Sequence, residues 1–181
     1  AATVTVEDTI PPTAVCLDLT LQLDSAGSAM IIPADVDGGS FDNCSLDTSN
    51  VSPAIFGCAD VGSNMVILTV TDVNGNTSTC TATVTIEDSV PPIALCQDLT
   101  VALDSSGNAI VPAADVDNGS SDACGIDTLA VNPASFDCSD LDTNTVVLTV
   151  TDNNGNTSTC SATITIQDTL APIALCQSDT L

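Results

Sequence analysis

The side chains of this chain that could do chemistry are nearly all carboxylates and thiols. The chain has 24 Asp and Glu residues and nine Cys, but no Lys, Arg or His. It therefore lacks the cations that neutralise phosphates, which excludes nucleic acid as a partner. General-base chemistry on His or Lys is excluded as well. Paired carboxylates, oxygen ligands for a hard divalent cation and disulfides remain.

Oxygen ligands gather in three segments of the chain, and these segments return 80 residues later. Calcium binds six to eight oxygens from carboxylates, amides and backbone carbonyls, so the segments would form a site if the fold brought them together. We expect Asp72 and Asp152 to be the main ligands, followed by Asp37 and Asp117. The alternative for each is that Asp and Asn merely stabilise turns. The expected ligands are Glu7, Asp8, Asp35, Asp37, Asp42, Asp72, Asn74 and Asn76, with Glu87, Asp88, Asp115, Asp117, Asp122, Asp152, Asn154 and Asn156.

An internal repeat sets the elements that must position these residues. Asp8, Asp88 and Asp168 each open a Pro-containing segment that ends in a cysteine, and they lie 80 residues apart. The other cysteines return in the same register without a gap. An exact repeat of domain length predicts that each unit folds alone and that copying adds length, which suits spacers, adhesins and fibres. We predict two complete units, residues 9–88 and 89–168.

The two ends of the chain are expected to be partial units. Residues 1–8 match the last strand of a preceding repeat, and residues 169–181 match the first strand of a following one. One interpretation is that the chain is a window on a longer array of repeats. The other is a self-assembling subunit whose terminal strands, Ala2–Glu7 and Ile173–Leu181, complete neighbouring molecules by strand addition.

The predicted fold class is all-β. Segments rich in Val, Ile and Thr alternate between apolar and polar residues, as in Thr81–Ile86 and its copy Ser161–Ile166. Turn-forming clusters separate them, and the Asn74-Gly75 pair favours a tight hairpin. About seven short strands per unit fit a tandem array of immunoglobulin-like β-sandwiches, in which the three ligand-bearing segments meet at one end. No stretch approaches the roughly 20 apolar residues of a membrane helix, so we expect no membrane span.

Three motifs of each unit form a specific combination. They are Asp-Thr-Ile-Pro-Pro at residues 8–12, Asp-Asn-Cys at 42–44, and Thr-Asp-Val-Asn-Gly-Asn-Thr-Ser-Thr-Cys at 71–80. Together they resemble the hyalin repeat family and its relatives in giant bacterial surface adhesins, over both complete units and both terminal fragments. The resemblance implies an extracellular sandwich domain for adhesion or display, without catalytic residues. The chain departs from the family in placing Cys58 and Cys138 late in the unit.

The four cysteines of each unit allow three connectivities. In an immunoglobulin-like sandwich the early edge strand can lie parallel to the last strand, which would bring Cys16 beside Cys80. The expected pairs are Cys16–Cys80, Cys44–Cys58, Cys96–Cys160 and Cys124–Cys138, and Cys176 then has no partner within the chain. Closing the larger loop stabilises a small core by roughly 4 kcal/mol. Free thiols in a reducing cell are the alternative, and zinc is disfavoured because His and Cys-x-x-Cys are absent.

Attached sugars are a second possible modification. Several triplets of Asp, then Ser or Thr, then an apolar residue resemble a signal for O-linked glycans on exported bacterial proteins. A chain rich in Asp, Ser and Thr also matches this signal by chance, although its recurrence in the linkers favours it. The acceptors would be Thr9, Ser89, Thr169, Ser25 and Thr128.

Two classes of function fit the sequence. The first is a non-enzymatic structural repeat of an extracellular, secreted or cell-surface adhesin or fibre, stiffened by disulfides and calcium and contacting neighbouring repeats or copies of itself. The second is a binding module whose loops hold a carbohydrate or another surface protein. The chain has no Trp or Tyr to stack on a sugar, which favours the first. An enzyme would need a constellation that breaks the copying, and the nearest carboxylate pairs recur in both units.

Overall fold

The computed structural model describes residues 1–175, which divide into two compact units, the first Ala1–Val90 and the second from Pro91 onward. The strands of the first unit are β1 (Leu19–Gln22), β2 (Ser28–Met30), β3 (Leu46–Ser52), β4 (Ile55–Gly57), β5 (Gly62–Asp72) and β6 (Thr77–Glu87), with α1 at Pro33–Val36 and η1 at Cys58–Asp60. The second unit has β7 (Leu99–Ala102), β8 (Asn108–Ile110), β9 (Ile126–Asn132), β10 (Ser135–Asp137), β11 (Asp142–Asp152) and β12 (Thr157–Gln167), with α2 at Ala113–Val116 and η2 at Cys138–Asp140.

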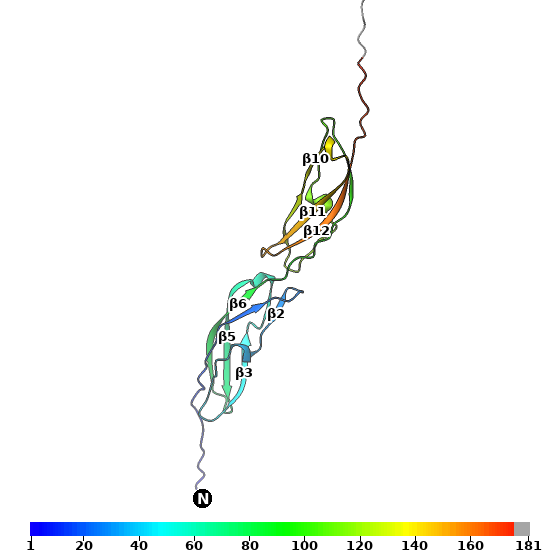
Figure 1. Cartoon of the computed structure of the whole chain (residues 1–181). Helices are drawn as coiled ribbons and strands as arrows, with labels where there is room; N and C mark the ends of the chain where they lie inside the picture. The colour runs from blue at the N-terminus through cyan, green and yellow to red at the C-terminus, as the bar shows by residue number, and fades with distance from the viewer. Residues whose placement is uncertain (176–181) are drawn as a thin grey trace, which may run out of the picture. The chain divides into compact units, whose positions relative to one another are not determined.

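Each unit is an immunoglobulin-like sandwich of a four-stranded and a two-stranded sheet, so the predicted fold class is confirmed. In the first unit the larger sheet has the order β1-β6-β5-β3, and β2 pairs with β4. The long antiparallel hairpin of β5 and β6 forms its centre (Figure 1). The second unit repeats this arrangement with the order β7-β12-β11-β9 and the pair β10-β8.

The first strand of each unit lies on the edge of the larger sheet, parallel to the last strand. Leu19 of β1 pairs with Val84 of β6, and Leu99 of β7 pairs with Ile164 of β12 in the same register. The parallel edge predicted from the sequence is therefore confirmed. A short parallel edge strand of this kind is also what brings the beginning and the end of a unit together.

The core of each unit lies between its two sheets. Alternate residues of the central hairpin point inward and are fully buried, among them Leu68 on β5 and Ile86 on β6. Phe56 of β4 and Val36 of α1 are buried as well, and in the second unit their counterparts Phe136 and Val116 belong to one core cluster with Leu148 and Ile166. The outward positions of β6 are mostly Thr, which is why polar and apolar residues alternate strictly in the sequence of this strand.

The structure has six strands per unit among its described residues, where about seven were expected. The segment after Pro11-Pro12 makes only isolated bridges, from Thr13 to Phe41 and from Cys16 to Asp37. A strand cannot extend back through Pro11 and Pro12, because proline has no backbone N–H to donate. The helices α1 and α2 have four residues each, too few for a helical period to show in the sequence.

A disulfide closes each sandwich. Cys16 bonds to Cys80 with 5.8 Å between their Cα atoms, and Cys96 bonds to Cys160 with 5.9 Å. Each bond spans 64 positions of the sequence and ties the segment before the edge strand to the last strand. These are two of the four pairs expected from the sequence.

The other two expected pairs, Cys44–Cys58 and Cys124–Cys138, are wrong. Cys44 and Cys138 are free thiols in the described structure. Cys44 lies just before the seven-residue strand β3, and Cys58 follows β4 at the far end of that strand. Seven residues of strand span roughly 20 Å, whereas a disulfide needs Cα atoms within about 7 Å. The strand β9 separates Cys124 from Cys138 in the same way.

The terminal segments differ from the units. Residues 1–10 belong to no strand of the described structure, and neither do residues 169–175. Their expected pairing with neighbouring repeats stays a prediction, and the rest of the expected C-terminal strand, with Cys176, lies outside the described residues. No helix in the described part of the chain is long and apolar enough to cross a membrane.

Candidate functional site

Two ends of each sandwich can be defined by where the chain enters and leaves it. At the entry end, the Asn76 amide of the β5–β6 turn donates to the backbone oxygen of Asp8, on the segment that leads into the unit, at 3.1 Å. At the exit end, the Leu23 N–H donates to the backbone oxygen of Glu87, the last residue of β6, at 2.9 Å. The candidate site lies at the entry end.

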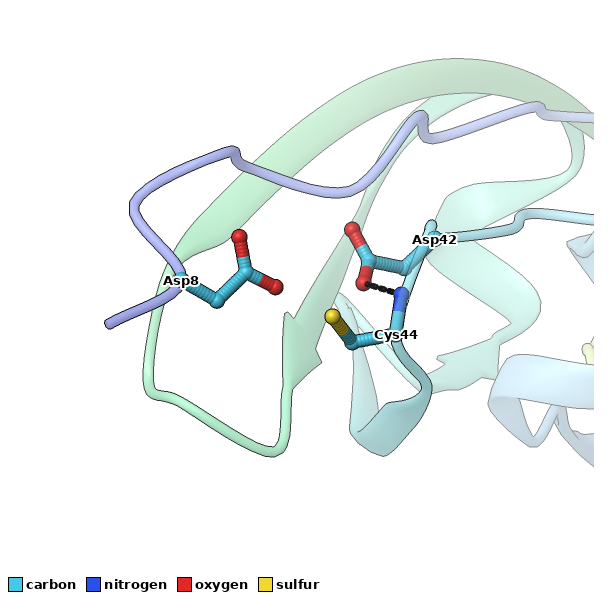
Figure 2. A group of neighbouring side chains, drawn as sticks. All are labelled: Asp8, Asp42 and Cys44. Atoms are coloured by element: carbon cyan, nitrogen blue, oxygen red, sulfur yellow. Dashed lines mark hydrogen bonds between the residues drawn. The ribbon is translucent and has the colours of Figure 1, made fainter. Parts of the chain in front are cut away.

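Three side chains with ligand atoms converge at the entry end of the first unit. One ligand atom from each of Asp8, Asp42 and Cys44 lies within 4.8 Å of the others. Figure 2 shows the two carboxylates facing each other, with the Cys44 sulfur beside them. Asp8 comes from the entering segment and Asp42 from the loop before β3, so segments far apart in sequence build the group.

Local hydrogen bonds fix one oxygen of each carboxylate. Asp8 Oδ1 accepts from the backbone N–H of Ile10 at 3.0 Å. Asp42 Oδ2 accepts from the N–H of Cys44 at 2.8 Å and of Ser45 at 3.3 Å. Both are turns in which an Asp side chain bonds the backbone two or three residues on. They leave the second oxygen of each carboxylate available.

The second carboxylate oxygens of Asp8 and Asp42 are the atoms of this site that are available to bind a ligand. Asp8 Oδ2 and Asp42 Oδ1 are buried and accept no hydrogen bond from any described residue. A buried carboxylate oxygen without a donor is costly, and two facing carboxylates also repel each other. A cation bound between them would remove both costs. Carboxylate oxygens are the ligands that calcium prefers, so the residues present fit such an ion.

Cys44 joins this group, a position that sequence reasoning missed by assigning it to a disulfide. The pKa of the Cys44 thiol is raised, first by the neighbouring Asp8 carboxylate, then by desolvation and by the charges of Asp42 and Asp72. The thiol thus stays protonated at neutral pH. The spacing Asp42-x-Cys44, which lets the Cys44 N–H bond the Asp42 carboxylate, is the one signal in the sequence that could have indicated this position.

Asp72, expected to be the main ligand, holds the β5–β6 turn. It is buried, and its Oδ1 accepts from the N–H groups of Asn74 and Asn76, each at 2.8 Å. Its Oδ2 accepts from the Asn76 amide, also at 2.8 Å. Burial raises the pKa of this carboxyl, but the hydrogen bonds from Asn76, Asn74 and Gly75 outweigh burial and lower it. Asp72 therefore orients Asn76, which in turn holds the backbone of Asp8.

The other expected ligands of the first unit are bound to other parts of the loops. The Asp37 carboxylate accepts from the Ser40 hydroxyl at 2.7 Å, and this bond is the largest of those that lower the pKa of Asp37. Asp35 accepts from the Ile32 N–H at the start of α1 at 2.7 Å. Glu87 lies at the exit end, where Gln22 donates to it, while Glu7 and Asn74 are exposed. Whether any of them binds a metal stays a prediction.

The second unit repeats these local contacts. Asp122 Oδ1 accepts from the Cys124 N–H at 2.7 Å, as Asp42 does from Cys44. Asp152 is buried and bonds the N–H groups of Asn154 and Asn156, and the same causes as in Asp72 lower its pKa. The remaining expected ligands are Asp88, which accepts from the Val90 N–H, Asp115, which is exposed, and Asp117, which accepts from the Ser120 N–H.

The expected sugar acceptors are all accessible. Thr9, Ser25, Ser89, Thr128 and Thr169 are exposed. Thr128 lies within β9, whereas the other four lie outside the strands. Exposure permits modification but does not select it, so glycosylation stays a prediction.

No family model matches the chain, and no curated protein matches its sequence. Among solved structures, the chain is similar to human protocadherin-24 EC1-2, with 12% identity and a TM-score of 0.45 over 88% of this chain and 100% of that one. Protocadherin gamma B7 domains 1-4 match with 14% identity and a TM-score of 0.39 over 87% of this chain and 51% of that one. Mouse PcdhgC3 EC1-3 matches with 14% identity and a TM-score of 0.35, over 87% and 68%.

The chain spans between 32% and 51% of the length of the protocadherin gamma chains B7, B3 and B4. All these TM-scores are below 0.5. The likeness therefore assigns no ligand, partner or activity to this chain.

Proposed function

We propose that this chain is a structural repeat of an extracellular bacterial adhesin or fibre, a stalk stabilised by disulfides and calcium. The observation that carries the proposal is that two units with the same strand order, register and disulfide follow from one 80-residue repeat. Identical modules in tandem add length without adding a new site. The disulfides indicate an oxidising compartment, which agrees with a secreted or surface protein.

The position of the disulfide suits a module that carries tension. A pulling force enters the first unit through the segment before Cys16 and leaves it after Cys80, and the bond joins these two residues directly. The 64 positions between them cannot be drawn out while the bond is intact. The second unit has the same bypass from Cys96 to Cys160. A stalk built this way keeps its length even when the small cores are under load.

Calcium is the proposed stabiliser of the entry end. Asp8 and Asp42 would bind the ion through their buried, unpaired oxygens and so hold the entering segment against the loop before β3. The chain carries a formal charge of −24, and bound divalent cations would reduce its self-repulsion. In this role Asp72 acts indirectly, by positioning the turn that fixes Asp8.

Single-molecule force spectroscopy tests the proposal. When the oxidised chain is pulled from its ends, we expect each unit to lack the release of about 220 Å that 64 residues would give at about 3.4 Å per residue. Reduction should restore that release in both units. If the oxidised chain extends by its full contour length at low force, the chain is no tension-bearing stalk.

Isothermal titration calorimetry tests the calcium part separately. We expect calcium to bind at one site per unit, and D8N with D42N to remove the site of the first unit. The control is D47N, which removes a charge at an exposed position of β3. Equal calcium binding by D47N and by the D8N/D42N chain would exclude Asp8 and Asp42 as ligands.

A further inference from the structure

Each unit carries one cysteine at its entry end and one at its exit end, outside the disulfide that closes the sandwich. Cys44 is exposed beside the entering segment of the first unit. Cys138 is exposed after β10 in the second unit, and its thiol donates to the backbone oxygen of Gly107 at 3.7 Å. Gly107 belongs to the turn that follows Leu103, whose N–H bonds Gln167 at the end of β12. Cys138 therefore lies at the exit end.

The exit-end thiol is held in a defined position. The Cys58 sulfur makes the corresponding contact in the first unit, 3.8 Å from the backbone oxygen of Gly27. Gly107 has a φ of +76°, and a Cβ there would lie 2.8 Å from the Cys138 sulfur. The turn thus needs glycine for its conformation and for the close approach of the sulfur. The contact between the cysteine sulfur and the glycine oxygen recurs in both units, and it holds the exposed Cys138 thiol in one position where an unconstrained side chain would adopt many rotamers.

The two classes of cysteine also differ in state between the units. Cys58, the counterpart of Cys138, takes part in a disulfide, and so does Cys124, the counterpart of Cys44. Each class is therefore found oxidised in one unit and as a free thiol in the other. The strands β3 and β9 keep the entry and exit cysteines of one unit too far apart to bond each other. A disulfide of the free Cys44 or Cys138 would therefore require a partner from outside its own unit.

We infer that Cys138 of one molecule forms a disulfide with Cys44 of a second copy of this chain, so that copies join covalently from exit end to entry end. The contact uses two different surfaces of the same protein. Such heterologous contacts repeat without closing when the rotation between copies does not return to the start, which produces filaments. The inference rests on the proposed function as a fibre repeat and identifies its partner.

The bond requires an oxidant, for which a low-molecular-weight disulfide such as oxidised glutathione suffices. One protein thiolate attacks a sulfur of that disulfide, forms a mixed disulfide and releases one glutathione thiolate. The second protein thiolate attacks the protein sulfur of the mixed disulfide and releases the other glutathione thiolate. Two protein thiols thereby lose two electrons and two protons, and one oxidised glutathione becomes two reduced molecules.

Two variants with one free thiol each test this pairing. The chain with C44S and C176S retains Cys138, and the chain with C138S and C176S retains Cys44. C176S removes the ninth cysteine, which lies outside the described residues. Each variant is incubated alone, and both are mixed in equal amounts in a glutathione buffer with EDTA. Dimers are separated without reductant and cleaved at Asp, because the chain offers trypsin no Lys or Arg. Mass spectrometry then identifies the linked peptides.

Random coupling in the mixture would make half of all dimers Cys138 to Cys44. We expect a clear excess over half, together with a reducible ladder of oligomers from the chain that carries only C176S. A mixed fraction of half or less, or no dimers, overturns the inference. EDTA makes this result independent of calcium, and the force measurement depends only on the disulfides within the sandwiches. The force measurement can therefore refute the proposed function while the Cys138–Cys44 pairing is confirmed, and the pairing can be refuted while the proposed function is confirmed.

Discussion

Replacing Asp42 of the facing pair in the first unit, together with its counterpart Asp122 in the second, should stabilise the calcium-free protein. In D42N with D122N, the amide oxygen can still accept the N–H of Cys44 or Cys124, so the turn survives. The amide nitrogen takes the place of the orphan oxygen of Asp42 and can donate to Asp8. With ligand atoms within 4.8 Å, two unit charges repel by about 1 kcal/mol in water and about 3 kcal/mol at an effective dielectric constant of about 20.

Differential scanning calorimetry in EDTA measures the relief of the carboxylate repulsion, and the same measurement in excess calcium measures the loss of stabilisation by the ion. In EDTA we expect the melting temperature of the double variant to rise by about 4 °C or more, since 1 kcal/mol corresponds to roughly 4–8 °C for a domain of this size. In calcium at about 100 times its dissociation constant, the wild type should gain about 2.7 kcal/mol per site, and the variant should lose that gain.

The matched control is D47N with D127N, which removes the same charge from exposed positions of β3 and β9. It corrects for the general relief of self-repulsion in a chain of charge −24. The reasoning is refuted if, in EDTA, D42N with D122N is no more stable than this control. Retention of the full calcium effect in D42N with D122N would refute the assignment of the ligands.

Three further predictions concern the scaffold. C96S with C160S should destabilise the second unit by about 4 kcal/mol in urea unfolding, because it opens a loop of 64 positions, while C138S, at a free thiol, should change little. Since the pKa values of Asp72 and Asp152 are lowered, the unfolded state binds protons first, so their stabilisation is present above the ordinary Asp pKa of roughly 3.9 and is lost as pH falls below it. The free energy of unfolding, measured in urea from about pH 5 to 2, should therefore fall less steeply with decreasing pH in D72N with D152N than in the wild type. An equal slope in the two proteins would contradict this. G107A should destabilise the protein more than G119A, because both glycines have a positive φ but of the two only an added Cβ at Gly107 would meet a sulfur, that of Cys138 at 2.8 Å. Equal melting temperatures would show that the Cys138 side chain moves aside at no cost.

The sequence by itself determined the fold class and the repetition of the fold in two units. Alternation of Val, Ile and Thr with Thr or Ser marks strands, because side chains of a strand point to opposite faces in turn. The parallel pairing expected of the first and last strands made Cys16 and Cys80 predictable partners, since Cys16 lies just before the edge strand β1 and Cys80 lies within its neighbour β6. Equal spacing of 80 residues then carried each feature of the first unit to the second.

Only the tertiary structure decided which oxygen ligands meet and which cysteines are apart. Asp72 and Asp42 are both acidic loop residues in the sequence, but the carboxylate of Asp72 is taken up by its own turn, while one oxygen of Asp42 faces Asp8 unpaired. Cys44 and Cys58 are near in sequence, yet β3 carries the chain from one end of the sandwich to the other between them. Local spacing fixes the direction of a strand and the chemistry of a turn. It does not fix where distant segments come together, because that depends on how the whole sandwich packs.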